Sequence, residues 1–73
     1  MTLNEKIELL EEIMDLDEET LTQDMDLDDL DEWDSLSVLS LTVEMKKRYG
    51  MDLTTEIVKK FKTVADICNY IPD

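Results

Sequence analysis

The apolar residues of this chain recur mainly at the spacing of an α-helix. In residues 3–14 they fall three or four positions apart, and Thr2 with Glu5 makes a capping-box pattern just before them. The apolar stripe consists of Leu3, Ile7, Leu10 and Met14, widened by Leu9 and Ile13. The pattern predicts a first helix over residues 3–14 that packs into a bundle by this face.

Residues 35–49 show the strongest helical pattern. Two sets of apolar residues lie side by side on this segment: Val38, Leu41, Met45 and Tyr49, and then Leu36, Leu39 and Val43. Asp34 is a good N-cap, three cations occupy the last turn, and Gly50 is a typical helix stop. Because this apolar face is wide, part of it is expected to lie outside so small a core.

The remaining segments predict shorter elements. Residues 15–34 contain sparse apolar residues separated by acids, and we expect a turn of helix there because long structureless loops are unusual in compact domains. Residues 54–60 predict a short third helix, and Thr63 with Asp66 caps a last helix that Pro72 ends. The fold class is therefore expected to be all-α: a small up-down bundle of three main helices plus one short helix, with a long loop between the first two.

Composition limits what this chain can do. Its 73 residues suffice for one domain, residues 1–73. There is no His, the commonest general base and metal ligand, and the lone Cys68 is expected to be a packed thiol, so an enzyme is disfavoured. No stretch approaches the ~20 apolar residues of a membrane span. A cytoplasmic protein without membrane insertion is therefore expected.

The net charge of −13 is unevenly distributed. Residues 1–35 hold fifteen acids and one base, whereas residues 36–73 hold five acids and six bases. Such a field repels nucleic acid, favours a monomer and attracts basic protein partners. The acidic run over residues 24–29 lacks the Gly and Glu that an EF-hand loop requires, so no metal site is predicted.

A resemblance to a known family centres on Asp34-Ser35-Leu36 at the start of the helix over residues 35–49. An acidic loop with Leu27 and Leu30 precedes this triplet, and Tyr49-Gly50, Leu53, Phe61, Thr63-Val64 and Ile67 through Tyr70-Ile71 follow it. In this register nearly the whole chain resembles the acyl carrier protein family. The resemblance implies that Ser35 carries 4′-phosphopantetheine derived from coenzyme A. Acyl or aminoacyl groups would travel as thioesters on that arm, without catalysis by the carrier.

The same resemblance suggests roles for the neighbours of Ser35. A helix N-terminus receives a phosphate well, although an inert capping Ser is what composition alone favours. Asp34 is expected to cap the helix and to face the phosphopantetheinyl transferase. Contacts with that transferase and with acyl-loading and acyl-transferring enzymes are expected at Leu36, Ser37, Ser40, Val43 and Glu44. A core that opens to shelter a short acyl group is expected from Val38, Leu41, Met45, Ile57, Val58, Phe61, Val64 and Ile67. Trp33 is expected to pack over the helix end or to touch the arm.

The charge of the second helix departs from the family pattern. Fatty-acid carriers usually bear acids on this helix, whereas here it bears Lys46, Lys47 and Arg48, and the third helix bears Lys59 and Lys60. A carrier of a specialised pathway related to fatty-acid biosynthesis is therefore favoured, serving secondary-metabolite, amino-acyl or surface-polysaccharide synthesis. The alternative is a stand-alone acidic helical interaction module with an unmodified Ser35, which would bind a basic partner through residues 15–32.

Overall fold

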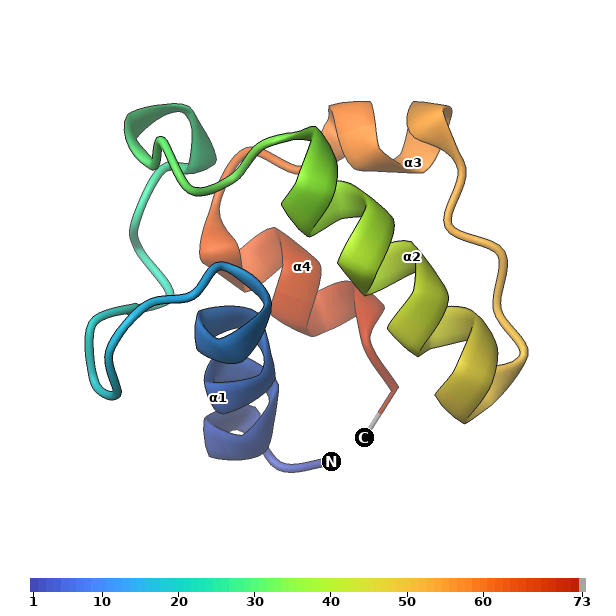
Figure 1. Ribbon diagram of the computed structural model, residues 1–73, viewed down its shortest axis with the longest axis horizontal. Coiled ribbons are helices and arrows are strands. Elements are labelled where there is room, and N and C mark those ends of the chain that lie inside the picture. Colours follow the sequence, from blue (N-terminus) through green and yellow to red (C-terminus); the bar gives the residue numbers. More distant parts are fainter. Residues whose placement is uncertain (73) are drawn as a thin grey trace.

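The computed structural model describes residues 1–72, which form four α-helices and one short 3-10 helix (Figure 1). In chain order they are α1 (Leu3–Ile13), η1 (Leu27–Asp29), α2 (Ser35–Tyr49), α3 (Thr55–Lys60) and α4 (Val64–Tyr70). Within the described residues there is no strand, only an isolated bridge between Asp26 and Thr63. The all-α class predicted from the sequence is confirmed. The helix over residues 35–49 has the predicted bounds, and the first helix ends one residue earlier than predicted.

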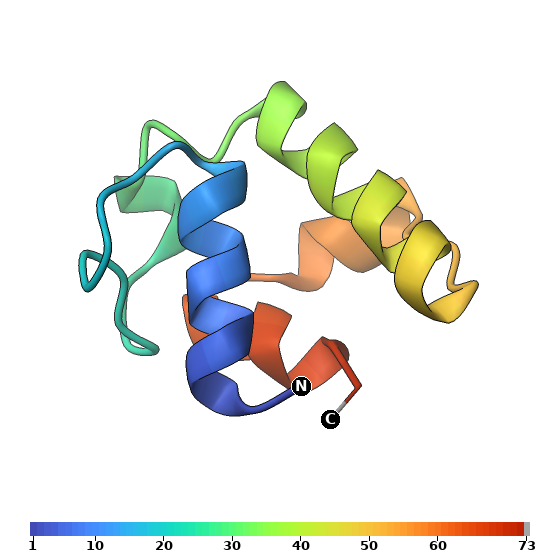
Figure 2. The ribbon, with the colours of Figure 1, turned by 60° about the horizontal axis from the view of Figure 1, so that its bottom comes forward.

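The helices α1, α2 and α4 surround a common interior, and the short α3 lies beside the N-terminal half of α2 (Figures 1 and 2). The interior contains apolar side chains from all three main helices and from the connections between them. The buried set is Leu9, Leu10, Met14, Leu21, Leu27, Leu41, Met45, Leu53, Val64, Ile67, Cys68 and Ile71. Burial of this apolar surface is the main force that holds the short helices together, because isolated helices of this length are marginal in water.

The helices begin and end at capping residues that the sequence pattern predicts. Thr2 with Glu5 and Thr63 with Asp66 both form complete capping boxes, at the starts of α1 and α4. Gly50 follows α2 with φ of +67°, a left-handed conformation that glycine adopts without steric cost. No helix among residues 1–72 is long and apolar enough to cross a membrane.

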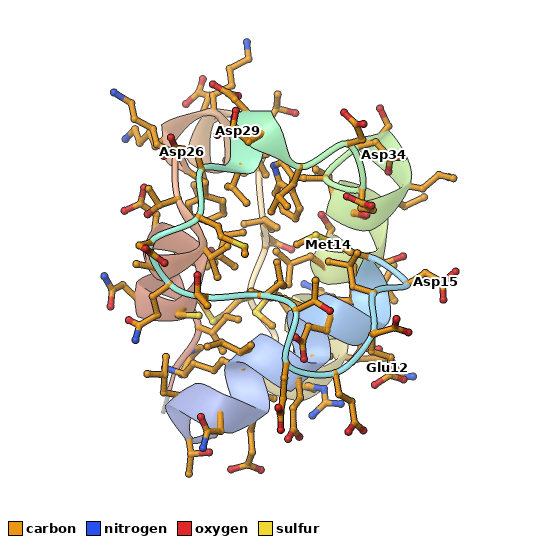
Figure 3. All side chains as sticks on the ribbon, turned by 90° about the vertical axis from the view of Figure 1, so that its left-hand side faces the viewer. Glu12, Met14, Asp15, Asp26, Asp29 and Asp34 are labelled. Atoms are coloured by element: carbon orange, nitrogen blue, oxygen red, sulfur yellow. The ribbon has the colours of Figure 1, made fainter. Side chains whose placement is uncertain are left out.

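A buried carboxylate organises the first half of the connection between α1 and α2. The Glu11 side chain is almost completely buried, and its Oε2 accepts hydrogen bonds from the backbone N–H groups of Thr20 at 2.7 Å and Leu21 at 2.9 Å. Between Glu11 and Thr20 the chain reverses direction, and the backbone has a positive φ at Asp15 and Glu19. In Figure 3, Met14 points into the interior and Asp15 points away from it. The sequence pattern did not reveal this role of Glu11.

Backbone pairing holds the second half of the connection against the segment that leads into α4. The N–H of Leu27 donates to the carbonyl of Lys62 at 2.8 Å, and the N–H of Val64 donates to the carbonyl of Met25 at 3.0 Å. A further bond runs from the N–H of Ala65 to the carbonyl of Gln23. The long connection is therefore packed against the bundle, and η1 is the turn of helix that was predicted within it.

Replacement of Glu11 by Ala should lower the free energy of unfolding by about 2–3 kcal/mol, because two backbone N–H groups lose a charged acceptor. In a domain of this size that loss corresponds to a fall of about 10–20 °C in the melting temperature. Glu8→Ala is the matched control, since it removes the same charge from an exposed position of α1. Thermal unfolding followed by circular dichroism distinguishes them, and equal melting temperatures would contradict the assignment.

The Asp66 carboxylate predicts a pH-dependent contribution to stability. Hydrogen bonds from the backbone N–H groups of Lys62 and Thr63 lower the pKa of this carboxyl below its usual 3.8. A carboxyl with a lowered pKa stabilises the fold above its unfolded pKa and loses that effect as the pH falls through the folded value. Urea unfolding should therefore show a larger difference between wild type and Asp66→Asn at pH 7 than at about pH 2. A difference that stays constant with pH would contradict this role.

Candidate functional site

The start of α2 is fixed by a side-chain cap. Asp34 has an extended backbone, and its Oδ1 accepts hydrogen bonds from the N–H groups of Leu36 and Ser37, both at 3.1 Å. Ser35 is the first residue of the helix and is exposed to solvent. The cap therefore presents the Ser35 hydroxyl at the surface, next to the positive end of a helix of 15 residues.

A cavity of about 510 Å³ opens beside Ser35, between α2 and the segment that contains Leu53 and α3. Apolar side chains form most of its wall, and Asp34 is its one charged residue. The lining residues are Trp33, Asp34, Ser35, Val38, Leu39, Thr42, Leu53, Thr55 and Val58. An exposed hydroxyl at the rim of a largely apolar cavity is an arrangement that fits a long prosthetic group esterified to Ser35, because the group could reach either the solvent or the cavity.

The residues predicted to shelter a cargo separate into two groups. Val38 and Val58 line the cavity together with Ser35. Leu41, Met45, Val64 and Ile67 are fully buried in the core, and Ile57 and Phe61 are partly buried against it. Phe61 also makes an edge-to-face contact with Tyr70, with ring centroids 5.6 Å apart.

Several cavity residues were not assigned to the site from the sequence. Leu39 and Thr42 lie four and seven positions after Ser35, a helical spacing that could have placed them on the same side of α2. Trp33 was expected near the helix end, where the structure places it. Leu53 and Thr55 come from a segment whose approach to α2 depends on tertiary packing, so no local pattern could have identified them.

A second face of α2 is apolar and open to solvent. Leu36 is 74 % exposed, Leu39 is 60 % exposed and Val43 is 50 % exposed. Because they lie three and four positions apart, they form one stripe that begins next to Ser35, with the exposed Ser40 beside it. Exposed apolar stripes of this kind mark surfaces for partner proteins. We call these four residues the α2 stripe.

Ser37 does not belong to this surface, and its predicted contact with partner proteins is wrong. Its side chain is only 4 % exposed, and its hydroxyl donates to the backbone carbonyl of Glu32. Ser37 therefore faces the preceding loop and is not available to a partner. Glu44 is partly buried and pairs with Arg48 at 2.8 Å.

The charges around the α2 stripe are mixed. Arg48 is paired with Glu44, and Lys46 is paired with Asp52 at 3.1 Å. Lys47 is exposed and makes no salt bridge within residues 1–72. The acids lie instead along the connection before α2, where Figure 3 labels Asp15, Asp26 and Asp29. The distribution inferred from the sequence, with acids before Ser35 and cations after it, is therefore kept in three dimensions.

Cys68 is a core residue, which confirms the packed thiol predicted from the sequence. Its side chain is 2 % exposed, and burial raises the pKa of its thiol. Its backbone carbonyl accepts a hydrogen bond from the buried Lys6 ammonium at 3.0 Å. A protonated thiol without access to solvent is a poor nucleophile.

Comparison with known proteins identifies similar chains. Residues 7–71 match the family model described as a phosphopantetheine attachment site. An acyl carrier protein from Renibacterium salmoninarum is 33 % identical over 69 residues, which cover 94 % of this chain and 76 % of that relative. One from Rickettsia bellii is 42 % identical over 40 residues, 55 % of this chain and about half of that relative (49 %). A solved structure of holo acyl carrier protein from Geobacter metallireducens has a TM-score of 0.69 at 29 % identity, covering 93 % of this chain and 78 % of that chain.

Removal of the Asp34 cap should destabilise α2. Asp34→Ala is expected to lower the free energy of unfolding by about 1 kcal/mol. Asp34→Ser should keep most of the wild-type stability, because a Ser hydroxyl also accepts hydrogen bonds from the helix N–H groups. Asp31→Ala controls for the loss of one negative charge at an exposed position of the same loop. Urea unfolding measures all three variants. Equal stability of Asp34→Ala and Asp31→Ala would show that the cap does not hold the helix start.

Proposed function

Because this chain belongs to the acyl carrier protein family, we propose that Ser35 is the residue to which its 4′-phosphopantetheine arm is attached. The observation that carries this assignment is the exposed Ser35 hydroxyl at the first residue of α2, on the rim of an apolar cavity. The other two serines of the chain are less suitable as attachment residues. Ser37 is buried and bonded to Glu32, and Ser40 lies outside the cavity.

Attachment requires a transferase and coenzyme A. The Ser35 oxygen forms a bond to the phosphorus atom that carries the pantetheine group of coenzyme A. The bond between this phosphorus and the bridging oxygen of the pyrophosphate breaks. Adenosine 3′,5′-bisphosphate leaves, and a base on the transferase takes the hydroxyl proton. Asp34 is held by two backbone N–H groups and so keeps a fixed position beside the hydroxyl. Its carboxylate is the polar group that this chain offers to the transferase at the reaction site.

Members of the family are carriers rather than enzymes. In this proposal the chain provides the residue that holds the arm and a cavity that can take up the group carried on it. The arm's thiol forms thioesters with acyl or aminoacyl groups, and the cavity beside Ser35 gives such a group a place out of water. We further propose that residues 1–73 form one carrier domain that acts as a monomer in the cytoplasm, where coenzyme A supplies the arm. The large negative charge favours the monomer through repulsion between copies.

Partner enzymes are proposed to dock on the α2 stripe, with Glu44 at its edge. The stripe begins at Leu36, one residue after the attachment point, so a partner that covers it also receives the arm. Lys46, Lys47 and Arg48 follow the stripe, and two of the three are paired with acids. An enzyme that recognises a strongly acidic helix finds little complementary charge here. This difference favours partners of a specialised pathway over those of housekeeping fatty-acid synthesis.

Incubation of the apo protein with coenzyme A and a promiscuous phosphopantetheinyl transferase tests the assignment. Intact mass spectrometry should show one added phosphopantetheine on the wild type and on Ser40→Ala, and none on Ser35→Ala. Circular dichroism checks that Ser35→Ala remains folded, which is expected because the Ser35 side chain is exposed. Addition to Ser35→Ala, or none to the wild type, would contradict the proposal and favour an unmodified acidic interaction module.

A further inference from the structure

The α2 stripe runs towards a cation, Lys47. Lys47 follows Val43 by four positions and Leu36 by eleven, which is about three helical turns, so these side chains share one face of α2. At a rise of about 1.5 Å per residue, about 16 Å of helix separates Leu36 from Lys47. Lys46 and Arg48 are each paired with a carboxylate, whereas Lys47 is exposed and makes no salt bridge within residues 1–72. The exposed apolar face therefore ends at a cation that can meet a group on another protein.

The opposite end of the stripe lies beside acids. A groove of about 340 Å³ runs between the end of α1 and the start of α2, and Leu36 is part of its lining. The carboxylates that line this groove belong to Asp15, Asp31, Glu32 and Asp34. Figure 3 shows Asp15 and Asp34 on the same side of the molecule. Asp34 is used by the helix cap, whereas Asp31 and Glu32 are exposed and their carboxylates have no partner within residues 1–72. The exposed face of α2 therefore has acids at the end next to the attachment point, apolar residues in its middle and a cation at the far end.

We infer that this face docks a partner protein in one orientation, which the order of the charges selects. The partner places a cationic group beside Asp31 and Glu32, an apolar ridge on the α2 stripe and a carboxylate opposite Lys47. The inference rests on the proposed attachment of the arm at Ser35, because the acidic end of the face is the end from which the arm enters the partner. In the reversed orientation like charges meet at both ends, which opposes binding and keeps the partner's active site away from the arm.

A partner of mixed charge fits this face better than the alternatives. A uniformly basic surface is repelled by Lys47, and a uniformly acidic surface is repelled by Asp31 and Glu32. A second copy of this chain could match the order of charges in an antiparallel arrangement, but two chains with a net charge of −13 repel each other. The same net charge opposes binding to an anionic membrane. The inferred partner is therefore a protein whose docking surface carries both signs of charge, with its cations nearest to its active site.

Cross-linked helical peptides, each about as long as α2, provide probes of this face. The bipolar peptide has Leu along one side, Arg at one end and Glu at the other, and the control peptide has Gln at both ends. Binding is measured by ¹H–¹⁵N NMR on the full chain in about 0.15 M NaCl, before and after the arm is attached. The bipolar peptide should bind about 5-fold more tightly than the control peptide, which is the effect expected of two exposed ion pairs.

A nitroxide label on one end of the bipolar peptide reports its orientation. A label on the Arg end should broaden the amide signals of residues 35–37, and a label on the Glu end should broaden those of residues 46–48. In Lys47→Glu the Arg end should broaden both groups of signals, because both ends of the face are then acidic. Lys62→Glu makes the same change of charge at an exposed position outside α2, and it should orient the peptide as the wild type does.

A variant that reverses the order of the charges gives the most direct test. It combines Asp31→Lys, Glu32→Lys and Lys47→Glu. All three side chains are exposed, so the fold should be kept, and circular dichroism checks this. In this variant the Arg end of the peptide should move to residues 46–48. An Arg end that stays at residues 35–37 in the variant, or that has no preferred position on the wild type, overturns the inference.

These outcomes are distinguishable from a failure of the attachment at Ser35. A peptide that binds in one orientation to a chain that the transferase does not modify contradicts the proposed attachment alone. Complete modification of Ser35 with no peptide binding, or with random orientation of the peptide, contradicts the inference alone. If the α2 signals of the peptide-free protein broaden as its concentration rises, the face is occupied by a second copy of the chain and the inference is overturned.

Discussion

The hydrogen bonds from two helix N–H groups to the Asp34 carboxylate fix where α2 begins, and the burial of Leu41 and Met45 fixes which face of the helix meets the core. Once the helix begins at Ser35, its residues divide among three surroundings. Leu41 and Met45 enter the core, Val38 and Thr42 line the cavity, and Leu36 and Val43 stay in solvent. Because the directions of side chains along a helix are fixed relative to one another, Ser35, the cavity residues of α2 and the α2 stripe have a constant geometry.

Most of the acids and most of the cations of the chain lie on different segments. Most acids lie in α1 and in the connection before α2, where the buried Glu11 carboxylate and backbone pairing with the segment before α4 hold the chain in place. The cations lie after Ser35 and are partly neutralised by Glu44 and Asp52. The cavity beside Ser35 and the α2 stripe are mostly apolar, whereas Asp31, Glu32 and Asp34 lie close to Leu36 on the side of the preceding loop.

Periodicity and capping patterns predicted the helices well, because both depend on residues close together in the sequence. The helix over residues 35–49, with Asp34 before it and Gly50 after it, is an example of this local information. Tertiary contacts were harder to predict. Ser37 was expected at the surface but is buried by its bond to Glu32, and the pairing of Glu11 with residues 20–21 had no local signature. Leu53 and Thr55 complete the cavity only because the chain returns to α2 after Gly50.

The central claim is that Ser35 carries the arm in the living cell, and the protein isolated from the cells that make it can answer this directly. Proteolysis followed by tandem mass spectrometry of the peptide that spans residues 35–40 would localise any modification among the three serines. The account predicts phosphopantetheine, free or acylated, on Ser35 and on neither Ser37 nor Ser40. An unmodified peptide in actively growing cells, or an arm on another serine, would contradict it.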